Sequence, residues 1–435
     1  MDPVLVGVIG LIIMVLFIFT GMNIGMTFLI VGVVGYAVLV TPPAAISLLK
    51  TTFYTTATNY NFVVIPLFIL MGEFCFRSGI SSDLYKMGDR WLSGLPGGLA
   101  CANVVACAFF GAICGSLAAT TATMGTVGLP EMRKAGYKDT LSCGSIAAGG
   151  TLGILIPPST TFIIYGIAAE VSIGRLFASG IVPGVICVVL MVATIIMWVK
   201  TVPGTAPEAK AHSWKERFES LKGLIGVAVL FLFVFGGMFA GVFTVNEAAG
   251  AGAFLAGVLM IVRRRMTWQN LKAALLSTAK SFSMVYLCLM GANVMGNFIA
   301  VSKIPSTLAL FIGGLDVSKY VILTIIILLY VFLGCIMDGL AVILLTVPIF
   351  FPILCGQLGF DPVWFGVIII MTSQIGGITP PVGVSCYALS GVCKDIPLQT
   401  IFKGIFPFLI PLIVTIIVIT IFPALATWLP NLLYS

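Results

Sequence analysis

Long runs of apolar residues, separated by short polar stretches, set the pattern of this chain. An α-helix needs about 20 mainly apolar residues to cross the hydrocarbon core of a bilayer. The pattern predicts spanning helices at residues 4–20, 24–40, 62–76, 176–199, 223–240, 244–262, 275–299 and 401–428. Pro42 and Pro43 are expected to end the second helix, because proline interrupts the helical hydrogen-bond ladder. The fold class expected is an all-α membrane protein that crosses the bilayer many times.

Four further apolar stretches contain residues that a continuous spanning helix avoids. Residues 98–130 and 320–354 are too long for one helix and have small or polar residues near the middle, which predicts two re-entrant hairpins. Residues 140–169 and 363–392 are each interrupted by a tandem Pro-Pro pair, which predicts two broken helices. Irregular backbone at this depth is tolerated only where protein or a cavity surrounds it.

The polar stretches have different predicted roles. Residues 77–96 are amphipathic and are expected to form a helix at the membrane interface, and residues 301–319 occupy the equivalent place later in the chain. Residues 131–139 form a charged patch. Residues 200–222 are the longest polar loop and mark the midpoint of the molecule.

The two halves repeat one another at a nearly constant offset. Gly111 and Gly334 are 223 residues apart, and so are the two Pro-Pro pairs. The fourteen residues from Met71 match those from Met295 at seven positions, at an offset of 224. One proline kink would mean little, but paired broken segments in two halves are typical of secondary transporters, whose binding site lies between the repeats.

Composition excludes a soluble protein and sets a membrane orientation. The chain has 435 residues, 60% of them hydrophobic and 9% charged, with a mean hydropathy of +1.18. Its 22 Lys and Arg exceed its 15 acidic residues, but they lie in short loops, so we expect no nucleic-acid partner. Most occur in five loops, at 77–96, 131–139, 200–222, 263–272 and 392–403. The positive-inside rule makes these loops cytoplasmic.

This orientation makes specific predictions about topology. Each half has five full crossings when its hairpin is counted as re-entrant, so the two halves are inverted relative to one another. Both termini are then periplasmic. The first hairpin enters the membrane from the cytoplasm and the second from the opposite side.

The sequence has few residues of the types that bind transition metals or act as catalytic bases. The 11 cysteines lie mostly in apolar runs without a CxxC pair, which indicates free buried thiols. His212, the only histidine, lies in a polar loop. We therefore expect no transition-metal site and no catalytic residues. An intramembrane enzyme would need a nucleophile with a base, and the apolar segments offer no histidine.

Helix breaks inside a membrane expose backbone groups that can bind ions. Freed carbonyl oxygens suit Na⁺, and the N-terminal ends of half-helices favour anions. Asp338 is the only charged residue between residues 320 and 360 and lies at the tip of the second hairpin. An isolated intramembrane carboxylate is expensive and usually functional, so Asp338 is expected to orient the tip or contribute to a cation or proton site. The alternative is a tip that reaches water.

Three other charged residues are assigned no role in the site. Glu73 has Arg77 four residues later, which favours a pair on a helix surface. Glu247 is expected to be solvated near a turn. Lys280 lies within a predicted span, from which its side chain can reach the interface.

The repeated motifs resemble those of a known transporter family. The segments GSLAATTATMGTVGLPEMRKAGY, GGTLGILIPPS, GCIMDGLAVILLTVPIFFPI and ITPPVGV are similar to the large membrane subunit, DctM type, of tripartite ATP-independent periplasmic (TRAP) transporters. The resemblance implies a secondary transporter that carries organic acids across the bacterial inner membrane, driven by Na⁺. It implies an elevator mechanism, in which a transport domain moves against a scaffold.

The resemblance also implies particular site residues. Na⁺ would lie near the hairpin tips and Pro-Pro breaks, at Ser116, Gly153, Pro157, Gly334, Asp338, Gly376 and Thr379. The substrate would lie between them, near Ser116, Ser159, Thr161 and Asp338. No arginine lies in the broken segments, so helix ends, Na⁺ and hydroxyls would hold the acid. A C4-dicarboxylate, sialic acid and another sugar acid all remain open as substrates.

Domains and partners follow from the same resemblance. The transport domain would consist of residues 98–170 and 320–392, and the scaffold of residues 1–97, 171–319 and 393–435. The first and second interfacial stretches would act as arms. The expected partners are a separate small four-helix membrane subunit and a periplasmic binding protein. Two rivals remain: a stand-alone Na⁺/organic-anion symporter of the same fold, and a channel, which inverted hairpins disfavour.

Overall fold

Helices account for all regular structure in the described part of the chain. The computed structural model describes residues 2–209, 211–314 and 317–434. Its first half contains α1 (Pro3–Phe19), α2 (Ile24–Leu39), α3 (Pro42–Thr58), η1 (Tyr60–Val63), α4 (Val64–Arg77), α5 (Ile80–Leu92), α6 (Gly98–Cys114), α7 (Leu117–Lys134), α8 (Asp139–Leu155), α9 (Thr160–Ala168) and α10 (Ile173–Thr201).

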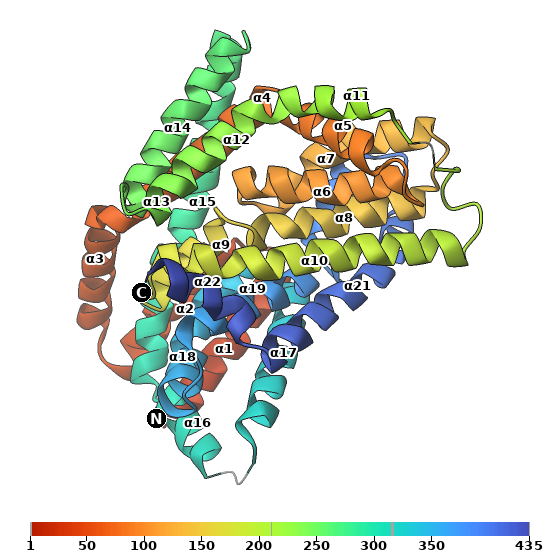
Figure 1. The fold of residues 1–435 in the computed structure, drawn as a ribbon. Helices are drawn as coiled ribbons and strands as arrows, with labels where there is room; N and C mark the ends of the chain where they lie inside the picture. Colours follow the sequence, from red (N-terminus) through yellow and green to blue (C-terminus); the bar gives the residue numbers. More distant parts are fainter. Residues whose placement is uncertain (1, 210, 315–316, 435) are drawn as a thin grey trace.

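The second half follows the same order (Figure 1). It contains α11 (Trp214–Ser220), η2 (Leu221–Leu224), α12 (Ile225–Phe231), η3 (Leu232–Gly236), α13 (Gly237–Phe239), α14 (Val245–Val262), α15 (Trp268–Val301), α16 (Ile304–Gly313), α17 (Lys319–Ile336), α18 (Gly339–Phe351), η4 (Pro352–Gln357), α19 (Pro362–Ile378), α20 (Val384–Val392), α21 (Leu398–Ile421) and α22 (Ala424–Leu433). Lys210 of the central loop and residues 315–316 of the second interfacial stretch lie outside the described residues.

The expected role of the first proline pair is wrong. α2 already ends at Leu39, and Pro42 and Pro43 form the first turn of α3, capped by the Thr41 hydroxyl. The first turn of a helix has no internal acceptor for its N–H groups, so a proline there removes no hydrogen bond. The polar loop 200–222 likewise contains a short helix, α11, that begins with a Ser213–Glu216 capping box.

The chain is a polytopic membrane protein by the length and composition of its helices. Within the described residues, eight helices are long and apolar enough to cross a membrane, or nine when α8 and α9, which are bent by 41°, count as one broken span. α1, α2 and α19 are apolar but have 17, 16 and 17 residues. The ten full crossings and the inverted topology therefore stay predictions.

The helices break where the sequence predicts breaks. α6 and α7 are separated by the tip Gly115–Ser116, and α17 and α18 by the tip Met337–Asp338. α8 ends at Leu155 and α9 begins at Thr160, while α19 and α20 are separated by residues 379–383. In both breaks the Pro-Pro peptide bond is cis.

The centre of the molecule is a packed layer around α8. α8 lies against α6, α7, α19 and α21, and Figure 1 shows α6, α8 and α10 running side by side. Gly111 of α6 faces Gly153 of α8 so closely that a Cβ on Gly111 would lie 2.5 Å from the Gly153 Cα. In the second half Gly376 of α19 faces Gly334 of α17, and its Cβ would lie 2.5 Å from the Gly334 carbonyl carbon.

One buried hydrogen bond joins the two halves at equivalent positions. Gln374 Nε2 of α19 donates to the Thr151 carbonyl oxygen of α8 at 2.8 Å, and these two residues are themselves 223 apart. Both side chains are fully buried. The bond therefore links the two broken helices directly.

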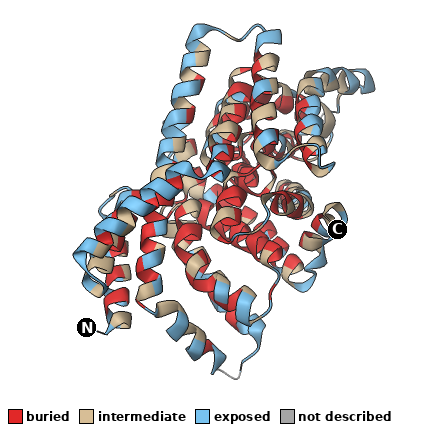
Figure 2. Cartoon of the chain, turned by 90° about the vertical axis from the view of Figure 1, so that its left-hand side faces the viewer, coloured by how far each residue is buried: buried red, intermediate tan, exposed pale blue. Residues whose placement is uncertain are grey.

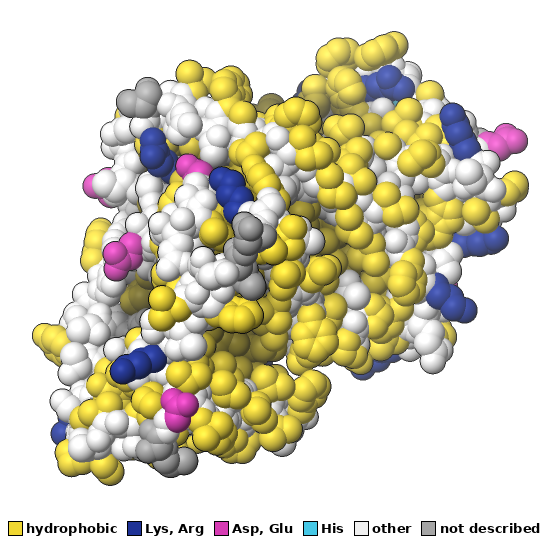
Figure 3. Space-filling view, turned by 90° about the horizontal axis from the view of Figure 1, so that it is seen from below, with side chains coloured by type: hydrophobic (Ala, Val, Ile, Leu, Met, Phe, Trp, Pro, Cys, Tyr) yellow, Lys and Arg dark blue, Asp and Glu magenta, His cyan; other side chains and the backbone are white. Residues whose placement is uncertain are grey.

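The outer surface is apolar, as expected for contact with lipid. Figure 2 shows buried residues concentrated in the central helices and exposed residues on the outer ones. Large hydrophobic side chains such as Leu232, Phe254 and Leu310 are more than 70% exposed. In the face shown in Figure 3 hydrophobic side chains dominate and charged side chains are few and scattered.

Candidate functional site

The first hairpin tip is built by a glycine and a capping serine. Gly115 ends α6 in the left-handed region at φ +63°, which only glycine adopts without strain. Ser116 follows as the N-cap of α7, where its hydroxyl accepts from the Ala119 N–H at 3.5 Å. The tip is held to the first helix break, because the Thr160 hydroxyl donates to the Gly115 carbonyl oxygen at 2.9 Å.

The second hairpin tip also has an N-cap residue, but this residue carries a carboxylate. Asp338 is the N-cap of α18, and its carboxylate accepts from the Leu340 N–H at 3.4 Å. A carboxylate is favourable at the positive end of a helix dipole. No Lys, Arg or His pairs with Asp338 among the described residues, so its charge is balanced only by the helix end.

Both tips face one cavity of about 600 Å³. Its walls combine α4, hairpin 1, α15, Asp338 of hairpin 2 and the broken helices. A smaller cavity of about 100 Å³ has Ser116, Thr160 and Asp338 in its wall as well, together with Thr161 and Ser373. Tips from the two halves of the chain therefore meet at a common space, as the sequence repeat predicts.

The predicted substrate residues do not all face this space. Ser116, Thr161 and Asp338 line one or both cavities. Ser159 is fully buried and lies outside both linings; its hydroxyl donates to the Ile154 carbonyl oxygen at 2.6 Å and accepts from the Phe162 N–H at 3.4 Å. Ser159 thus holds the two parts of the broken helix together.

The predicted Na⁺ residues form two groups, one in each half. In the first, a Cβ on Gly153 would lie 2.8 Å from Thr120 Oγ1 and 3.3 Å from the Ser116 carbonyl oxygen. The Thr120 hydroxyl is fully buried and has no partner among the described residues. Pro157 follows in the break between α8 and α9. An unpaired buried hydroxyl costs free energy. This corner is therefore suited to a cation that the Thr120 hydroxyl oxygen can coordinate.

The second group surrounds the end of α19. Gly334 and Gly376 bring α17 and α19 into contact, and Thr379 is the C-cap of α19. The Thr379 hydroxyl donates to the Ile375 carbonyl oxygen, which leaves its own oxygen available as an acceptor. Asp338 belongs to the tip that follows Gly334.

Several cavity residues were not predicted from the sequence. Glu73 pairs with Arg77 at 3.2 Å as expected, but it also lines the large cavity and accepts from the Ser277 hydroxyl. Thr123 and Ser281 line it too. Glu73 is an acidic residue in an apolar run, which could have indicated a functional position. Its i,i+4 partner Arg77 fitted an ion pair on the helix surface equally well.

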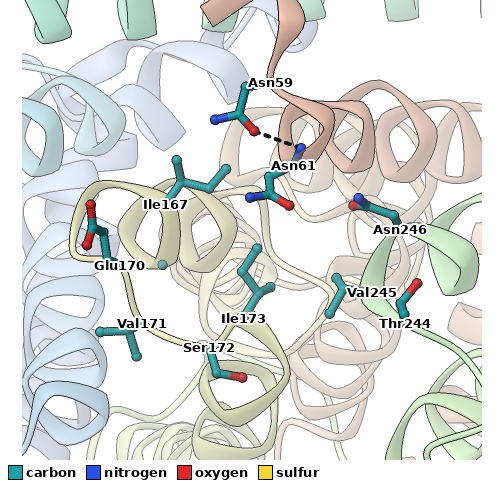
Figure 4. A pocket seen from close by; sticks show the side chains of 11 residues that line it. Asn59, Asn61, Ile167, Glu170, Val171, Ser172, Ile173, Thr244, Val245 and Asn246 are labelled. Atoms are coloured by element: carbon teal, nitrogen blue, oxygen red, sulfur yellow. Dashed lines mark hydrogen bonds between the residues drawn. The ribbon is translucent and has the colours of Figure 1, made fainter. Parts of the chain in front are cut away.

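A second polar cavity lies away from the tips. It has a volume of about 580 Å³ and is lined by the loops that connect α3 to α4, α9 to α10 and α13 to α14 (Figure 4). Two of its polar side chains are used locally: Asn59 accepts from the Asn61 N–H at 3.0 Å, and Asn246 donates to the Tyr60 carbonyl oxygen at 3.3 Å. Neither hairpin tip nor a Pro-Pro break contributes to it, so we do not assign it to the substrate.

Metal-binding and redox groups do not gather at the site. Across residues 2–209, 211–314 and 317–434 there is no group of three or more His, Cys, Asp or Glu that could hold a metal ion. His212 instead lies beside Arg90, with 2.6 Å between its Nδ1 and the Arg90 Nη1. All eleven cysteines are free thiols.

The base of hairpin 1 is fixed by an ionic cluster. Arg133 at the end of α7 donates to Asp139, at 2.8 and 3.0 Å, and to Asp395 in the loop between α20 and α21, at 2.5 Å. The Arg133 guanidinium lowers the pKa of the Asp395 carboxyl below its usual value. Most of the partners are exposed to solvent, so the cluster orients the loops more than it stabilises the fold.

Two hairpins and two broken helices around a central cavity are the arrangement typical of secondary transporters. The model of the family described as "Tripartite ATP-independent periplasmic transporter, DctM component" matches residues 11–425. The chain belongs to this family and is a large permease component of a TRAP transporter. It is therefore one component of a three-part system.

Known relatives support the family and differ in the named substrate. The chain is similar to the C4-dicarboxylate TRAP transporter large permease DctM of Pseudomonas aeruginosa, with 33% identity over 91% of this chain and 92% of that protein. It is 32% identical to the sialic acid TRAP transporter large permease SiaM of Vibrio cholerae, over 95% of this chain and 96% of that protein. Because the identities are nearly equal, they do not select a substrate.

A solved structure supports the fold. The YdaH transporter of Alcanivorax borkumensis aligns with a TM-score of 0.56 and 18% identity, over 87% of this chain and 88% of that one. At this identity the likeness concerns the fold alone.

Proposed function

We propose that this chain imports an organic acid across the bacterial inner membrane, coupled to Na⁺, and receives it from a periplasmic binding protein. The main observation that supports this proposal is the shared cavity, to which Ser116 and Asp338 contribute from the two hairpin tips. A small four-helix membrane subunit completes the system. Both termini of this chain are periplasmic in the proposed orientation.

Sodium coupling is supported by the oxygen atoms at the two breaks. Thr120 Oγ1 and the Ser116 carbonyl oxygen border Gly153 in the first half, while Thr379 and Asp338 lie near the second glycine pair. Na⁺ is a hard cation that takes hydroxyl, carbonyl and carboxylate oxygens. Ions bound beside both tips would also offset the charge of an acid between them.

Elevator transport is supported by contacts that unite the two predicted parts of the transport domain. Gln374 bonds to the Thr151 carbonyl oxygen, and the Tyr165 hydroxyl donates to the Pro362 carbonyl oxygen at 2.6 Å. Each bond joins residues 98–170 to residues 320–392. These parts would therefore travel together.

The moving body extends beyond the boundaries predicted from the sequence. An added Cβ on Gly144 of α8 would collide with the Gly404 carbonyl oxygen of α21, and one on Gly180 of α10 with the Leu155 carbonyl oxygen. Backbones packed this closely do not slide past one another without losing their contacts. We therefore place α10 and α21 with the transport domain, and keep the earlier helices of each half as scaffold.

Uptake into proteoliposomes tests the coupling. Vesicles would contain this chain and the small subunit, with the loaded binding protein outside, and a panel of organic acids would be offered in NaCl or choline chloride. Uptake is expected only in NaCl and only with both partners. Equal uptake in choline would refute the coupling, and Na⁺-dependent uptake without the binding protein would favour the stand-alone symporter.

A disulfide between scaffold and hairpin tests the movement. Gly72 of α4 packs on the first tip, where its Cβ would lie 3.1 Å from the Cys114 Cα, so Gly72→Cys can pair with the native Cys114 thiol. Oxidation is expected to stop uptake and reduction to restore it. Gly72→Ala and the double variant Gly72→Cys/Cys114→Ala are controls that should ignore the oxidant. Full uptake by the cross-linked protein would refute a moving hairpin body.

A further inference from the structure

The two cavities at the hairpin tips divide the proposed substrate site into a polar end and an apolar end. Ser116, Thr160 and Asp338 lie in the walls of both cavities, so the cavities meet at the tips. The small cavity adds Thr161 and Ser373. Its size, about 100 Å³, suits a carboxylate group rather than a whole metabolite.

The large cavity is apolar away from the tips. Side chains from α4, α6, α15 and α20 form this part of the wall, namely Ile69, Phe76, Phe110, Met284, Val285 and Val392. Phe76 is part of the exposed wall, and its ring lies edge to face on the fully buried Phe110, with ring centroids 6.4 Å apart, which fixes its orientation. An apolar group of a substrate would therefore be covered here at little cost in desolvation.

The charge of the lining disfavours a second carboxylate. Glu73 and Asp338 are the only charged side chains among the described residues that line the large cavity, and both are acidic. The Arg77 guanidinium pairs with Glu73 at 3.2 Å and does not itself line the cavity. A dicarboxylate with one end at the tips would bring its other end toward Glu73 or an apolar wall, where no cationic side chain of the lining would balance it.

The large cavity has few hydroxyl groups that are free to donate to a sugar acid. Thr126 donates to the Thr123 carbonyl oxygen at 2.7 Å, and Thr160 donates to the Gly115 carbonyl oxygen. Ser116, Thr126 and Thr160 are thus engaged with nearby backbone groups, and among the described residues Thr123 and Ser281 are the other two hydroxyl side chains of the large cavity. A polyhydroxylated acid would leave several of its own hydroxyls unpaired once the cavity closes around it.

We propose that the substrate of this chain is a monocarboxylate with an apolar body, branched or aromatic, rather than a dicarboxylate or a sugar acid. Its carboxylate lies at the hairpin tips, where the N-terminal ends of α7 and α9 converge and where the proposed Na⁺ ions offset the charge of Asp338. Its body lies against Phe76 and Met284. This inference rests on the proposed function, because it takes the cavity between the tips as the substrate site.

Direct binding to the purified permease complex tests the inference without the selectivity of the binding protein. The probes are 4-methylpentanoate and 3-phenylpropanoate as apolar monocarboxylates, glutarate as a dicarboxylate, and glucuronate as a sugar acid. Calorimetric titration in NaCl, with choline chloride as reference, gives each affinity. The apolar monocarboxylates are expected to bind about tenfold or more tightly than glutarate and glucuronate, since a closed apolar site leaves their extra polar groups unpaired.

The outcomes separate the two proposals. Equal or tighter binding of glutarate or glucuronate overturns the inference and leaves organic-acid transport intact. If no acid of any class binds, the proposed function itself fails, and the inference fails with it.

Two variants assign the selectivity to named side chains. Glu73→Gln removes the second negative charge at constant size and should reduce the discrimination against glutarate severalfold; Glu131→Gln, at an exposed position outside the cavity, is the matched control. Met284→Gln, at a half-exposed position that tolerates an amide, should reduce the preference for the apolar monocarboxylates over glucuronate. Leu276→Gln, on the same helix but outside the lining, is its control. Unchanged selectivity in both variants refutes the assignment of the walls.

Discussion

The two hairpins share one backbone design and differ in the chemistry of their tips. In each, a glycine of the first helix packs on a glycine of the neighbouring broken helix, Gly111 on Gly153 and Gly334 on Gly376. The tip residues that follow are not equivalent. The offset of 223 aligns Gly115 with Asp338, so one half has a left-handed glycine where the other has a carboxylate.

This difference separates what the repeat needs from what the site needs. The close glycine contacts occur in both halves because two helices must approach before either tip can reach the cavity. The charge occurs once, because a single carboxylate beside an anionic substrate already requires a cation to balance it. The backbone is thus the symmetric element, and the polar side chains make the two ends of the site different.

The largest effect is expected from filling the glycine contacts. Gly111→Ala and Gly376→Ala each place a methyl group 2.5 Å from facing backbone, and overpacking of this kind costs about 1–3 kcal/mol or more. Gly334→Ala should be milder, because its Cβ would lie 3.2 Å from the nearest atom, the Gly376 Cα. Thermal unfolding in detergent and uptake would rank the variants. Gly356→Ala, with open space around it, is the control, and similar losses in all four would contradict the ranking.

A smaller effect is expected from changing the tips. Asp338→Asn keeps the size and the capping oxygen but removes the charge, so half-maximal uptake should need more Na⁺, by a coupling of about 1–3 kcal/mol. Ser116→Ala should lose about 1 kcal/mol, the usual worth of a helix cap. Asp361→Asn is the matched control, since Asp361 caps α19 outside both cavities. A normal Na⁺ titration for Asp338→Asn would remove the carboxylate from the cation site.

The smallest effect is expected at the base of hairpin 1, where the halves also differ. Arg133 aligns with Gly356, so the bond to Asp395 has no ionic counterpart in the second half. Because the folded-state pKa of Asp395 is lowered, its stabilisation is present above the unfolded pKa of about 4 and is lost as pH falls through the folded value.

Thermal unfolding between about pH 6 and pH 3 would measure this contribution. Asp395→Asn should start slightly less stable and lose less on acidification than the wild type. Glu208→Gln, an exposed carboxylate of the central loop, serves as reference. A wild type and an Asp395→Asn variant with parallel pH curves would show that the pair contributes nothing.

The helix breaks were predictable from the sequence, because glycine, proline and a fixed offset act locally. The predicted helices at the tips and Pro-Pro pairs end where the structure has them. Other features depend on packing that one sequence does not reveal. The first half splits into α3 and α4 where the second half has the single helix α15, and the proline pair at residue 42 starts a helix instead of ending one.

The site was only partly predictable, for a related reason. A polar residue in an apolar run can either bind a ligand or bond to a neighbour in its own helix. Only its surroundings in the folded protein decide between these two interpretations. Glu73 pairs with Arg77 and also faces the cavity. Ser159 resembled a ligand but its hydroxyl is used to join α8 to α9. Thr120 is buried and has no hydrogen-bond partner among the described residues. The sequence cannot predict this, because it depends on the position of every neighbouring residue.

The hydrogen bond from Gln374 to Thr151 has a consequence for the history of the chain. A duplication begins with two identical copies, whose equivalent positions carry the same residue. Here one copy has an amide that reaches the main chain of the other, and the equivalent threonine bonds back within its own helix, to Ala148 at 2.7 Å. A molecule assembled from two first halves would lack this link. At this position the two copies have become complementary.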